Sequence, residues 1–272
     1  MTVTWLYVPG DRPERFAKAA ASGADEIIID LEDAVAPHHK DQARANALHY
    51  LHTNPGIPTQ VRINDLTTQR GRDDLAALTG APGLTAVRLP KVEPTTPLDT
   101  LDVPACALLE SAAGILNAAA IAAHPRITAL ALGEQDLTAE LSLTSPAALD
   151  HLRLQVILAA AAAGLPPVPM SVYPDVHDEQ GLIASCTAGR ALGMFGRTAI
   201  HPRQIPAIRQ AFRPTPEETA RAAEIVQAAT EAGQAAFTLP DGRFVDAPVL
   251  AKARRILTLA DRLADPGPPQ DS

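Results

Sequence analysis

This chain of 272 residues contains few aromatic residues and few cysteines, and its net charge is negative. Aromatic side chains make up 3% of it, so the core has to be built from aliphatic side chains. The formal net charge of −8 argues against a nucleic acid or an anionic membrane as a partner. The two cysteines, Cys106 and Cys186, lack the spacing of a metal-binding motif and are too few for a disulfide framework. They indicate a reducing compartment.

Long apolar runs are missing as well. The longest run of small apolar residues, 156–165, is far shorter than the ~20 residues that cross a bilayer. Residues 1–10 show no basic stretch followed by an apolar one, so we expect no secretory signal. Because 46% of the residues are apolar and 20% are charged, the chain can bury a full core. We therefore expect a cytoplasmic protein that does not associate with membranes.

A short β-type run, a polar or Gly/Pro turn and an Ala-rich helical stretch recur along the chain. The eight β-type runs lie at 5–8, 26–30, 60–63, 86–89, 105–109, 129–132, 168–173 and 197–200. The stretches between them are long enough for crossover helices, as parallel strands require. This count predicts a TIM (β/α)₈ barrel over residues 1–212.

The first helix of the barrel has a local start signal. Asp11 is the predicted N-cap, Pro13 falls in the first turn, and Glu14 follows the cap by three residues. This arrangement is typical of a capping box.

The pattern changes in residues 213–264. A helix is predicted over 214–231, opened by Thr215, and a final amphipathic helix over 248–263. Between them, runs at 235–239 and 243–245 flank the turn signal PDG, which predicts a hairpin. This extension belongs to the same predicted domain but is surplus to a closed barrel, so we expect it to pack on another surface, such as a neighbouring subunit. Residues 265–272 are rich in Pro and Gly and are predicted to be disordered.

Polar residues gather where the predicted strands end, which is where barrel enzymes carry their chemistry. Solvated loop charges explain some of them, but explain Arg62 and Glu110 poorly, since both follow apolar strand residues without an intervening turn. We therefore expect a site at this mouth. The residues in question are Asp11, Arg12, Asp30, Glu32, Asp33, Arg62, Asn64, Lys91, Glu93, Glu110, Asp136, Asp175 and His201.

Glu110 and Asp136 form the most informative pair, because they follow consecutive strands. Two unpaired carboxylates at adjacent strand ends would repel and raise each other's pKa. A divalent cation removes that conflict, and an all-oxygen site favours Mg²⁺ or Mn²⁺ over zinc. The alternative is that both carboxylates pair with Arg or Lys side chains.

Arg62 has the guanidinium geometry for binding a substrate carboxylate through two parallel hydrogen bonds. It is equally suited to be a counter-ion of Glu110 or Glu32. The cluster of Asp30, Glu32 and Asp33 has two open roles, which are orienting water molecules around a metal and pairing with Arg62 or Lys91.

Six segments, in order along almost the whole chain, resemble the HpcH/HpaI aldolase/citrate lyase family, and in particular its short members that are similar to the citrate lyase β subunit. They are VPGDRP (8–13), IDLEDAV (29–35), VRIN (61–64), LPKVE (89–93), LESAAG (109–114) and IHPRQI (200–205). The resemblance implies a TIM-barrel lyase, commonly a homotrimer, that acts on a short acyl thioester.

The resemblance also implies roles for individual residues. Glu110 and Asp136 match residues that hold Mg²⁺, and Arg62 matches one that binds the substrate carboxylate, so Glu110 and Arg62 are expected to bind substrate and take part in catalysis. Asp246 matches an acid or base that reaches a neighbouring subunit's active site. Residues near the coenzyme A thioester in relatives match Tyr7, Lys18, Ile200 and His201.

The resulting hypothesis is a Mg²⁺-dependent, or Mn²⁺-dependent, carbon–carbon lyase. It would cleave or form a 3-hydroxyacyl thioester such as citramalyl-, malyl- or citryl-CoA, with a 2-oxo acid and acetyl-CoA as the other partners. The thioester is carried by CoA or an acyl carrier protein. The alternatives are a class II aldolase on free 2-keto-3-hydroxy acids, a malyl- or citramalyl-thioester hydrolase, and a non-catalytic subunit that binds acyl-CoA.

Overall fold

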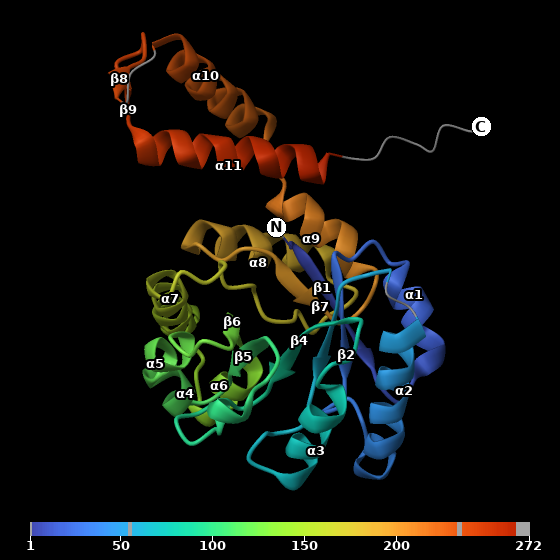
Figure 1. Cartoon of the computed structure of the whole chain (residues 1–272). Helices are drawn as coiled ribbons and strands as arrows, with labels where there is room; N and C mark the ends of the chain where they lie inside the picture. The colour runs from blue at the N-terminus through green and yellow to red at the C-terminus, as the bar shows by residue number, and fades with distance from the viewer. Residues whose placement is uncertain (1, 54–55, 233–235, 265–272) are drawn as a thin grey trace, which may run out of the picture. The chain divides into compact units, whose positions relative to one another are not determined.

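The computed structural model describes residues 2–53, 56–232 and 236–264 (Figure 1). The chain divides into two compact units, one of Thr2–Ala211 and one that begins at Phe212. Each unit is described by itself below. Among the described helices, none combines the length and the apolar character that a bilayer crossing requires.

The larger unit is built on a curled parallel sheet of seven strands. Its order is β6-β5-β4-β3-β2-β1-β7, so consecutive strands along the chain pair with each other, and β7 returns to β1. This confirms the TIM-barrel fold class. The strands are β1 (Thr4–Pro9), β2 (Glu26–Asp30), β3 (Thr59–Arg62), β4 (Leu84–Leu89), β5 (Ala105–Leu109), β6 (Ile127–Leu132) and β7 (Arg197–Ala199).

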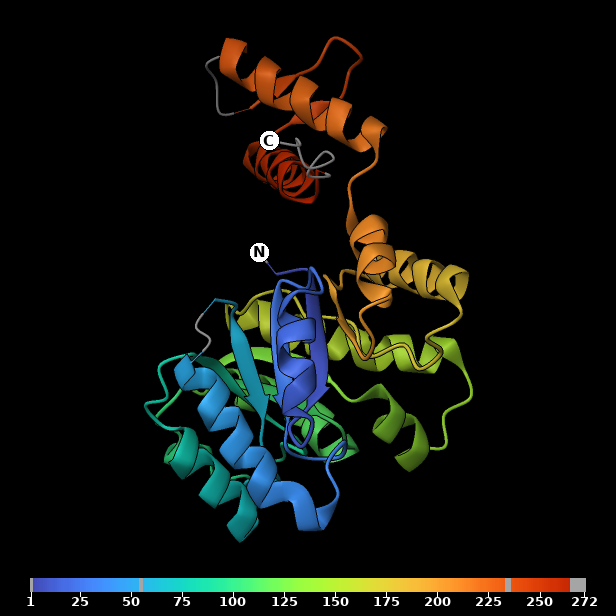
Figure 2. The ribbon, with the colours of Figure 1, turned by 90° about the vertical axis from the view of Figure 1, so that its right-hand side faces the viewer.

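Helices surround the outside of this sheet (Figures 1 and 2). Several begin with a side-chain cap, as at Thr68, Ser111 and Asp178, each of which accepts a hydrogen bond from the N–H three residues ahead. The helices are α1 (Phe16–Ala20), α2 (Lys40–Thr53), α3 (Gln69–Leu78), α4 (Ala112–Leu116), α5 (Ala118–Ala122), α6 (Glu134–Glu140), α7 (Pro146–Ala162), α8 (Glu179–Leu192) and α9 (Gln204–Phe212), with 3₁₀ turns at Pro13–Arg15, Pro37–His39 and Leu98–Thr100.

The inner face of the sheet differs from one side to the other. On β5 and β6 it carries small or aliphatic side chains, with Cys106, Leu108 and Ala131 in one buried cluster. On β3 and β4, Arg62 and Arg88 stand opposite each other in the strand register. Side chains alternate between the two faces of a strand, so both arginines point to the same face. The small side chains of β5 and β6 do not fill the space in front of the arginines of β3 and β4, and a cavity lies between them.

The predicted strand at 168–173 is wrong in its extent. Within the described residues this segment contributes a single bridge, Met170 to Arg197, beside β7. Met170 donates its N–H to the Gly196 carbonyl, at 2.9 Å. Beyond this bridge, the carbonyls of Ser171 and Tyr173 accept hydrogen bonds from the side chains of Arg197 and Gln204, at 2.9 and 2.8 Å.

The predicted cap of the first helix is also wrong. A 3₁₀ turn at Pro13–Arg15 comes first, its N-cap is Arg12 without a side-chain hydrogen bond, and the α-helix begins at Phe16. The carboxylate of Asp11 instead lies 3.3 Å from the Nδ1 atom of His39. An ionic or hydrogen-bonded partner outside the helix has taken the place of the cap.

The smaller unit contains α10 (Pro216–Ala232), α11 (Ala247–Leu263) and an antiparallel pair, β8 (Phe237–Thr238) and β9 (Phe244–Val245). The two predicted helices and the hairpin are confirmed where residues are described. Thr215 and Glu218 exchange side-chain to backbone hydrogen bonds of 3.1 and 2.9 Å, which is a capping box. The unit has its own apolar core, around Ile225, Leu239 and Val245. Ala235 and the predicted disordered tail at 265–272 lie outside the described residues.

Gly196, directly before β7, offers a test of the packing at this end of the sheet. Its φ is +78°, and an added Cβ would lie 2.5 Å from the Val3 carbonyl oxygen. Gly23 has a similar φ of +81° with nothing within 4 Å of an added Cβ. We expect Gly23→Ala to lower the free energy of unfolding by about 1 kcal/mol and Gly196→Ala by about 3 kcal/mol or more. Urea denaturation of both variants measures the difference, and equal losses would contradict the packing described here.

Candidate active site

A cavity of about 350 Å³ lies at the carboxyl ends of the strands. Charged residues from several strand ends line it, namely Asp30, Asp33, Arg62, Glu110 and Asp136. An adjoining hollow of about 390 Å³ has Lys91 and Glu93 in its wall. Glu110 and Asp136 line both hollows, so the structure brings the predicted metal pair to one place.

Glu110 follows β5 directly and is 7% exposed. Its Oε2 atom accepts a hydrogen bond of 2.9 Å from the backbone N–H of Lys91. Burial raises the pKa of Glu110 to about 7, against the opposing effect of that hydrogen bond, and the charges of Glu32 and Asp136 add to the rise. Among the described residues no basic side chain forms an ion pair with this carboxylate.

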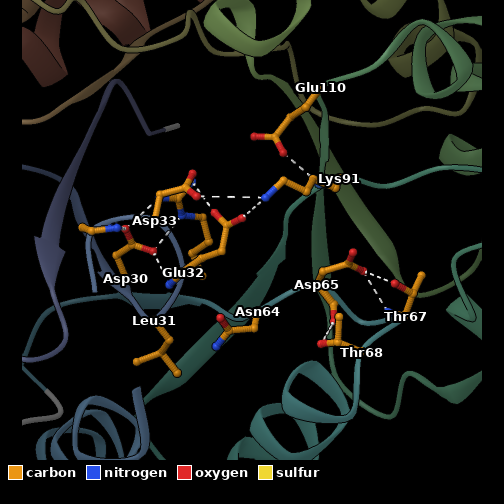
Figure 3. Close-up of polar contacts among 12 residues, drawn as sticks. Asp30, Leu31, Glu32, Asp33, Asn64, Asp65, Thr67, Thr68, Lys91 and Glu110 are labelled. Carbon is orange, nitrogen blue, oxygen red and sulfur yellow. Dashed lines mark hydrogen bonds and ion pairs between the residues drawn. The ribbon is translucent and has the colours of Figure 1, made fainter. Parts of the chain in front are cut away.

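Lys91 owes its position to an unusual backbone. Its φ is +53°, in the left-handed region that costs a side-chain-bearing residue about 1–3 kcal/mol. This conformation aims the N–H of Lys91 at Glu110 while the ammonium group contacts Glu32 and lies 4.0 Å from Asp33 (Figure 3). The backbone N–H of Lys91 therefore binds Glu110, while its charged side chain forms an ion pair with Glu32 and not with Glu110.

Arg62, at the end of β3, forms a two-point ion pair with Asp30 at the end of β2. Its Nε and Nη2 atoms donate to the two carboxylate oxygens at 2.7 and 2.6 Å. The Nη1 atom lies 2.9 Å from Glu32 and 3.3 Å from Asp33. Burial lowers the pKa of Arg62, but the hydrogen bonds and charge of Asp30 outweigh it and the pKa rises. Arg62 is thus a counter-ion to these carboxylates, and not to Glu110.

Glu32 and Asp33 share the cations of this cluster unequally. Glu32 is buried, and burial raises its pKa despite Arg62 and Lys91. Asp33 is exposed, and the hydrogen bond with Glu32 and the charge of Arg62 lower its pKa against the effect of burial. The Oε2 atom of Glu32 lies within ion-pair distance of Arg62 but in a direction unsuited to a hydrogen bond, and it accepts none among the described residues.

Asp136 lies in the first turn of α6, exposed, and no hydrogen bond joins its carboxylate to another described residue. The start of that helix is held by its neighbour Glu134, whose two carboxylate oxygens accept hydrogen bonds of 2.8 and 2.7 Å from Arg153. Asp136 is therefore on an anchored turn with both oxygens available.

This donor set fits a hard divalent cation. Glu110 and Asp136 supply carboxylate oxygens, and neither forms an ion pair with a basic side chain in the described part of the chain. No group of three or more metal-ligating side chains converges among the described residues. Two protein ligands suit Mg²⁺, which keeps several positions for water and substrate oxygens.

Two of the residues expected near the thioester line the cavity. The ring of Tyr7 lies under Arg62, with its centroid 5.0 Å from the guanidinium carbon. Ile200, which follows β7 on the strand next to β1, also lines the cavity and is 41% exposed, which is unusual for a large apolar side chain. Both are placed to contact a bound molecule.

Lys18 and His201 are not part of the cavity lining but lie close enough to interact. Burial lowers the pKa of His201, and the positive charges of Arg203, Lys18 and His177 add to that shift. Asp246 belongs to the smaller unit, where its Oδ1 caps α11 by accepting from the Val249 N–H at 3.1 Å.

The sequence interpretation missed three residues of this site. Lys40, in the first turn of α2, donates to the backbone carbonyls of Leu31 and Glu32 and so holds the acidic loop. Gly133 lies against the Glu110 side chain. Arg88 lines the cavity from within β4, and a signal for it existed, since a charged residue interrupts the apolar run 86–89.

Comparison with known proteins identifies the family of this chain. The chain matches the family model described as HpcH/HpaI aldolase/citrate lyase over residues 4–202. A (3S)-malyl-CoA thioesterase from Cereibacter sphaeroides is 39% identical over 274 residues, covering 95% of this chain and 94% of the relative. A citrate lyase subunit beta-like protein from Mycobacterium tuberculosis is 40% identical over 268 residues, covering 94% of each chain.

Among solved structures, CitE from Mycobacterium tuberculosis in complex with magnesium, acetoacetate and coenzyme A superposes with a TM-score of 0.82. It is 36% identical, and the match covers 96% of this chain and 98% of that chain. The chain belongs to the HpcH/HpaI aldolase/citrate lyase family, which confirms the resemblance seen in its sequence motifs. This is an enzyme family, and its relatives of nearly equal similarity carry the names of a thioesterase and of a lyase subunit.

The raised pKa of Glu110 predicts that cation binding depends on pH. A carboxylate with a pKa of about 7 is increasingly protonated below that pH, and the proton competes with the metal. We expect the affinity for Mg²⁺ to fall by up to about tenfold per pH unit below 7 and to level off above 8. Titration calorimetry between pH 6 and 8.5 measures this. Glu110→Gln should show no Mg²⁺-dependent rise in melting temperature, and an affinity that is equal at pH 6 and pH 8 would contradict the assignment.

Gly133 predicts a steric effect on the same carboxylate. A Cβ at this position would lie 2.4 Å from Cγ and 2.7 Å from Oε1 of Glu110, so Gly133→Ala forces the side chain to turn away. We expect affinity for Mg²⁺ to fall about tenfold or more, because one ligand is displaced. The control is Gly56→Ala, where nothing lies within 4 Å of an added Cβ. Unchanged Mg²⁺ affinity in Gly133→Ala would show that Glu110 does not bind the ion in this conformation.

Proposed function

We propose that this protein is a Mg²⁺-dependent carbon–carbon lyase that cleaves or forms a short 3-hydroxyacyl-CoA thioester, with a 2-oxo acid and acetyl-CoA as the products or reactants. The observation that carries the proposal is the pair of carboxylates, Glu110 and Asp136, which share a cavity wall and have no basic side-chain partner within residues 2–53, 56–232 and 236–264. Such a pair needs a cation from outside the chain. Solved relatives contain magnesium, and one of them contains coenzyme A as well.

In this proposal Glu110 and Asp136 hold Mg²⁺, which supplies Lewis acidity toward the hydroxyl and carboxylate oxygens of the substrate. Asp30 and Glu32 hold the guanidinium of Arg62 in one orientation, so that it stabilises negative charge at the cavity wall without moving. Lys91 keeps Glu110 in place through its backbone N–H. Tyr7 and Ile200 line the path of the acyl group. Lys18 and His201 are proposed to lie near the thioester, with His201 neutral because burial and the nearby charges of Arg203 and Lys18 lower its pKa.

Carbon–carbon cleavage leaves a thioester enolate, which a nearby acid must protonate at carbon. Asp246 is proposed for this role, acting on the active site of a neighbouring subunit in a homotrimer. Its Oδ1 atom accepts the capping hydrogen bond, and its Oδ2 atom has no hydrogen bond to another described residue. The neighbouring Phe244 is 63% exposed, which fits a surface that another chain covers.

Thioester hydrolysis is a second candidate, favoured by the 39% identity to (3S)-malyl-CoA thioesterases. The same two carboxylates and the same cation would hold a malyl-type acyl group while water attacks the thioester carbon. The two reactions differ in the bond that breaks and therefore in their products.

Product analysis separates the two reactions. The protein is incubated with Mg²⁺ and malyl-, citramalyl- or citryl-CoA, and the products are resolved by liquid chromatography and mass spectrometry. A lyase forms acetyl-CoA and a 2-oxo acid in equal amounts. Free CoA together with the intact hydroxy acid would establish hydrolysis and overturn the lyase proposal. Turnover of free 2-keto-3-hydroxy acids but of no thioester would instead indicate an aldolase.

The role of Asp246 predicts a large effect of Asp246→Asn. Asparagine caps a helix as well as aspartate does, so stability should hardly change, while the lost acid should lower turnover about 10²–10⁴-fold. The control is Asp261→Asn, an exposed aspartate on the same helix. Mixing Glu110→Gln with Asp246→Asn subunits should restore part of the activity, because some sites then combine an intact Glu110 with an intact Asp246 from another chain. Wild-type turnover in Asp246→Asn would remove this residue from the mechanism, and a mixture that stays inactive would contradict its action across subunits.

A further inference from the structure

Arg88 is a buried cation at the cavity that the proposed reaction does not use. It lies in the interior of β4, is 2% exposed, and contributes to the cavity wall. Its Nε atom donates to Gln60 at 3.2 Å, and its Nη1 atom lies 3.5 Å from the Tyr7 hydroxyl. No described carboxylate forms an ion pair with it. A buried charge without a paired anion is costly, so its presence needs an explanation.

The nearest buried acid is satisfied by neutral donors. Glu26 accepts hydrogen bonds of 2.7 Å from Trp5, 3.0 Å from Gln60 and 2.6 Å from Thr85. Against the effect of burial, its charge helps to raise the pKa of Arg88, but the hydrogen-bonded contact between the two residues runs through Gln60, whose amide donates to Glu26 and accepts from Arg88. The hydrogen bond with Gln60 orients the guanidinium group of Arg88, and it leaves the Nη1 and Nη2 atoms able to bind a carboxylate.

The remaining side-chain donor of Arg88 is its Nη2 atom. It has no hydrogen-bond partner among the described residues. Among the described residues, one side-chain oxygen or nitrogen is both fully enclosed and without a hydrogen-bond partner, and that atom is Oε2 of Glu32. Nη2 of Arg88 also lacks a partner within this part of the chain, so it must keep some accessible surface. Because Arg88 is part of the cavity wall, we infer that this accessible N–H donor is available to a molecule in the cavity.

Arg62 provides the contrast. The two arginines are register partners on adjacent strands, and Tyr7 lies against both, at 5.0 Å from Arg62 and 5.7 Å from Arg88. Asp30, Glu32 and Asp33 neutralise Arg62. Two similar cations thus line one cavity, one with its anions supplied by the chain and the other without.

We propose that Arg88 binds a second carboxylate of the substrate, and that the protein therefore selects thioesters whose hydroxyl-bearing half carries two carboxylates. One carboxylate is held with Glu110 and Asp136 at the cation, and the other is bound by Arg88 deeper in the cavity. In these terms citryl thioesters, which yield oxaloacetate, are preferred to citramalyl thioesters, which yield pyruvate and differ by that one carboxylate. This inference rests on the proposed function for the identity of the substrate, while the anion site itself does not require turnover.

The test measures binding of oxaloacetate and pyruvate to the Mg²⁺-loaded, full-length protein by titration calorimetry with freshly prepared acids. We expect wild-type protein to bind oxaloacetate at least roughly tenfold more tightly than pyruvate, as a charge-assisted hydrogen bond implies. Arg88→Met should bring the ratio close to one by weakening oxaloacetate alone, and Arg88→Lys should keep part of the preference. The stable pair malate and lactate, which differ by the same carboxylate, should follow the same order.

Arg197→Met is the matched control. Arg197 is also a buried arginine that stacks on a tyrosine and forms no ion pair with a described carboxylate, but it does not line the cavity. This variant should keep the preference for oxaloacetate. Equal binding of the two acids by wild-type protein overturns the inference even if Arg88→Met fails to fold, and so does an unchanged ratio in Arg88→Met. If Arg88→Met loses the preference for oxaloacetate but the wild-type protein forms no acetyl-CoA, the anion site is supported and the lyase proposal is rejected. The two failures are therefore distinguishable.

Discussion

The hydrogen bond from the Lys91 backbone to Glu110 is the interaction on which the site depends. It stabilises a buried carboxylate with a dipole instead of a counter-ion, which keeps Glu110 in place without neutralising it. The strained backbone of Lys91 makes this possible, since the same residue sends its ammonium group to Glu32. Had the lysine turned its side chain to Glu110, that carboxylate would be a partner in a salt bridge and could not bind a metal.

Around this bond, the mouth of the barrel separates two kinds of charge. On the side of β2 and β3, Asp30, Glu32 and Arg62 are neutralised within the chain and form a rigid wall. On the side of β5 and β6, Glu110 and Asp136 form no ion pair with a basic side chain among the described residues, and the pKa of Glu110 is raised to about 7. A cation bound there would gain the full electrostatic benefit of a preorganised, partly buried site.

The fold and part of the site could be predicted from the sequence because each depends on local patterns. The first six of the eight predicted β-type runs coincide with strands β1 to β6, and the last run, 197–200, contains β7. Glu110 and Asp136 share a cavity because parallel strands bring their carboxyl ends together. The run at 168–173 forms a single bridge, because side chains of Arg197 and Gln204 bind the carbonyls of Ser171 and Tyr173, which hydropathy cannot reveal. The cap at Asp11 failed because His39, distant in sequence, lies beside its carboxylate.

The sequence by itself determined the fold class, the family and the position of the acidic residues at strand ends, because strand periodicity and motif order are properties of neighbouring residues. Only the tertiary structure decided which charges cancel. Arg62 pairs with Asp30, Lys91 pairs with Glu32, and Arg88 forms no ion pair in the part of the chain that the structure describes. Pairing depends on distances of a few ångströms between strands far apart along the chain, and on backbone angles such as that of Lys91, which residue order does not specify.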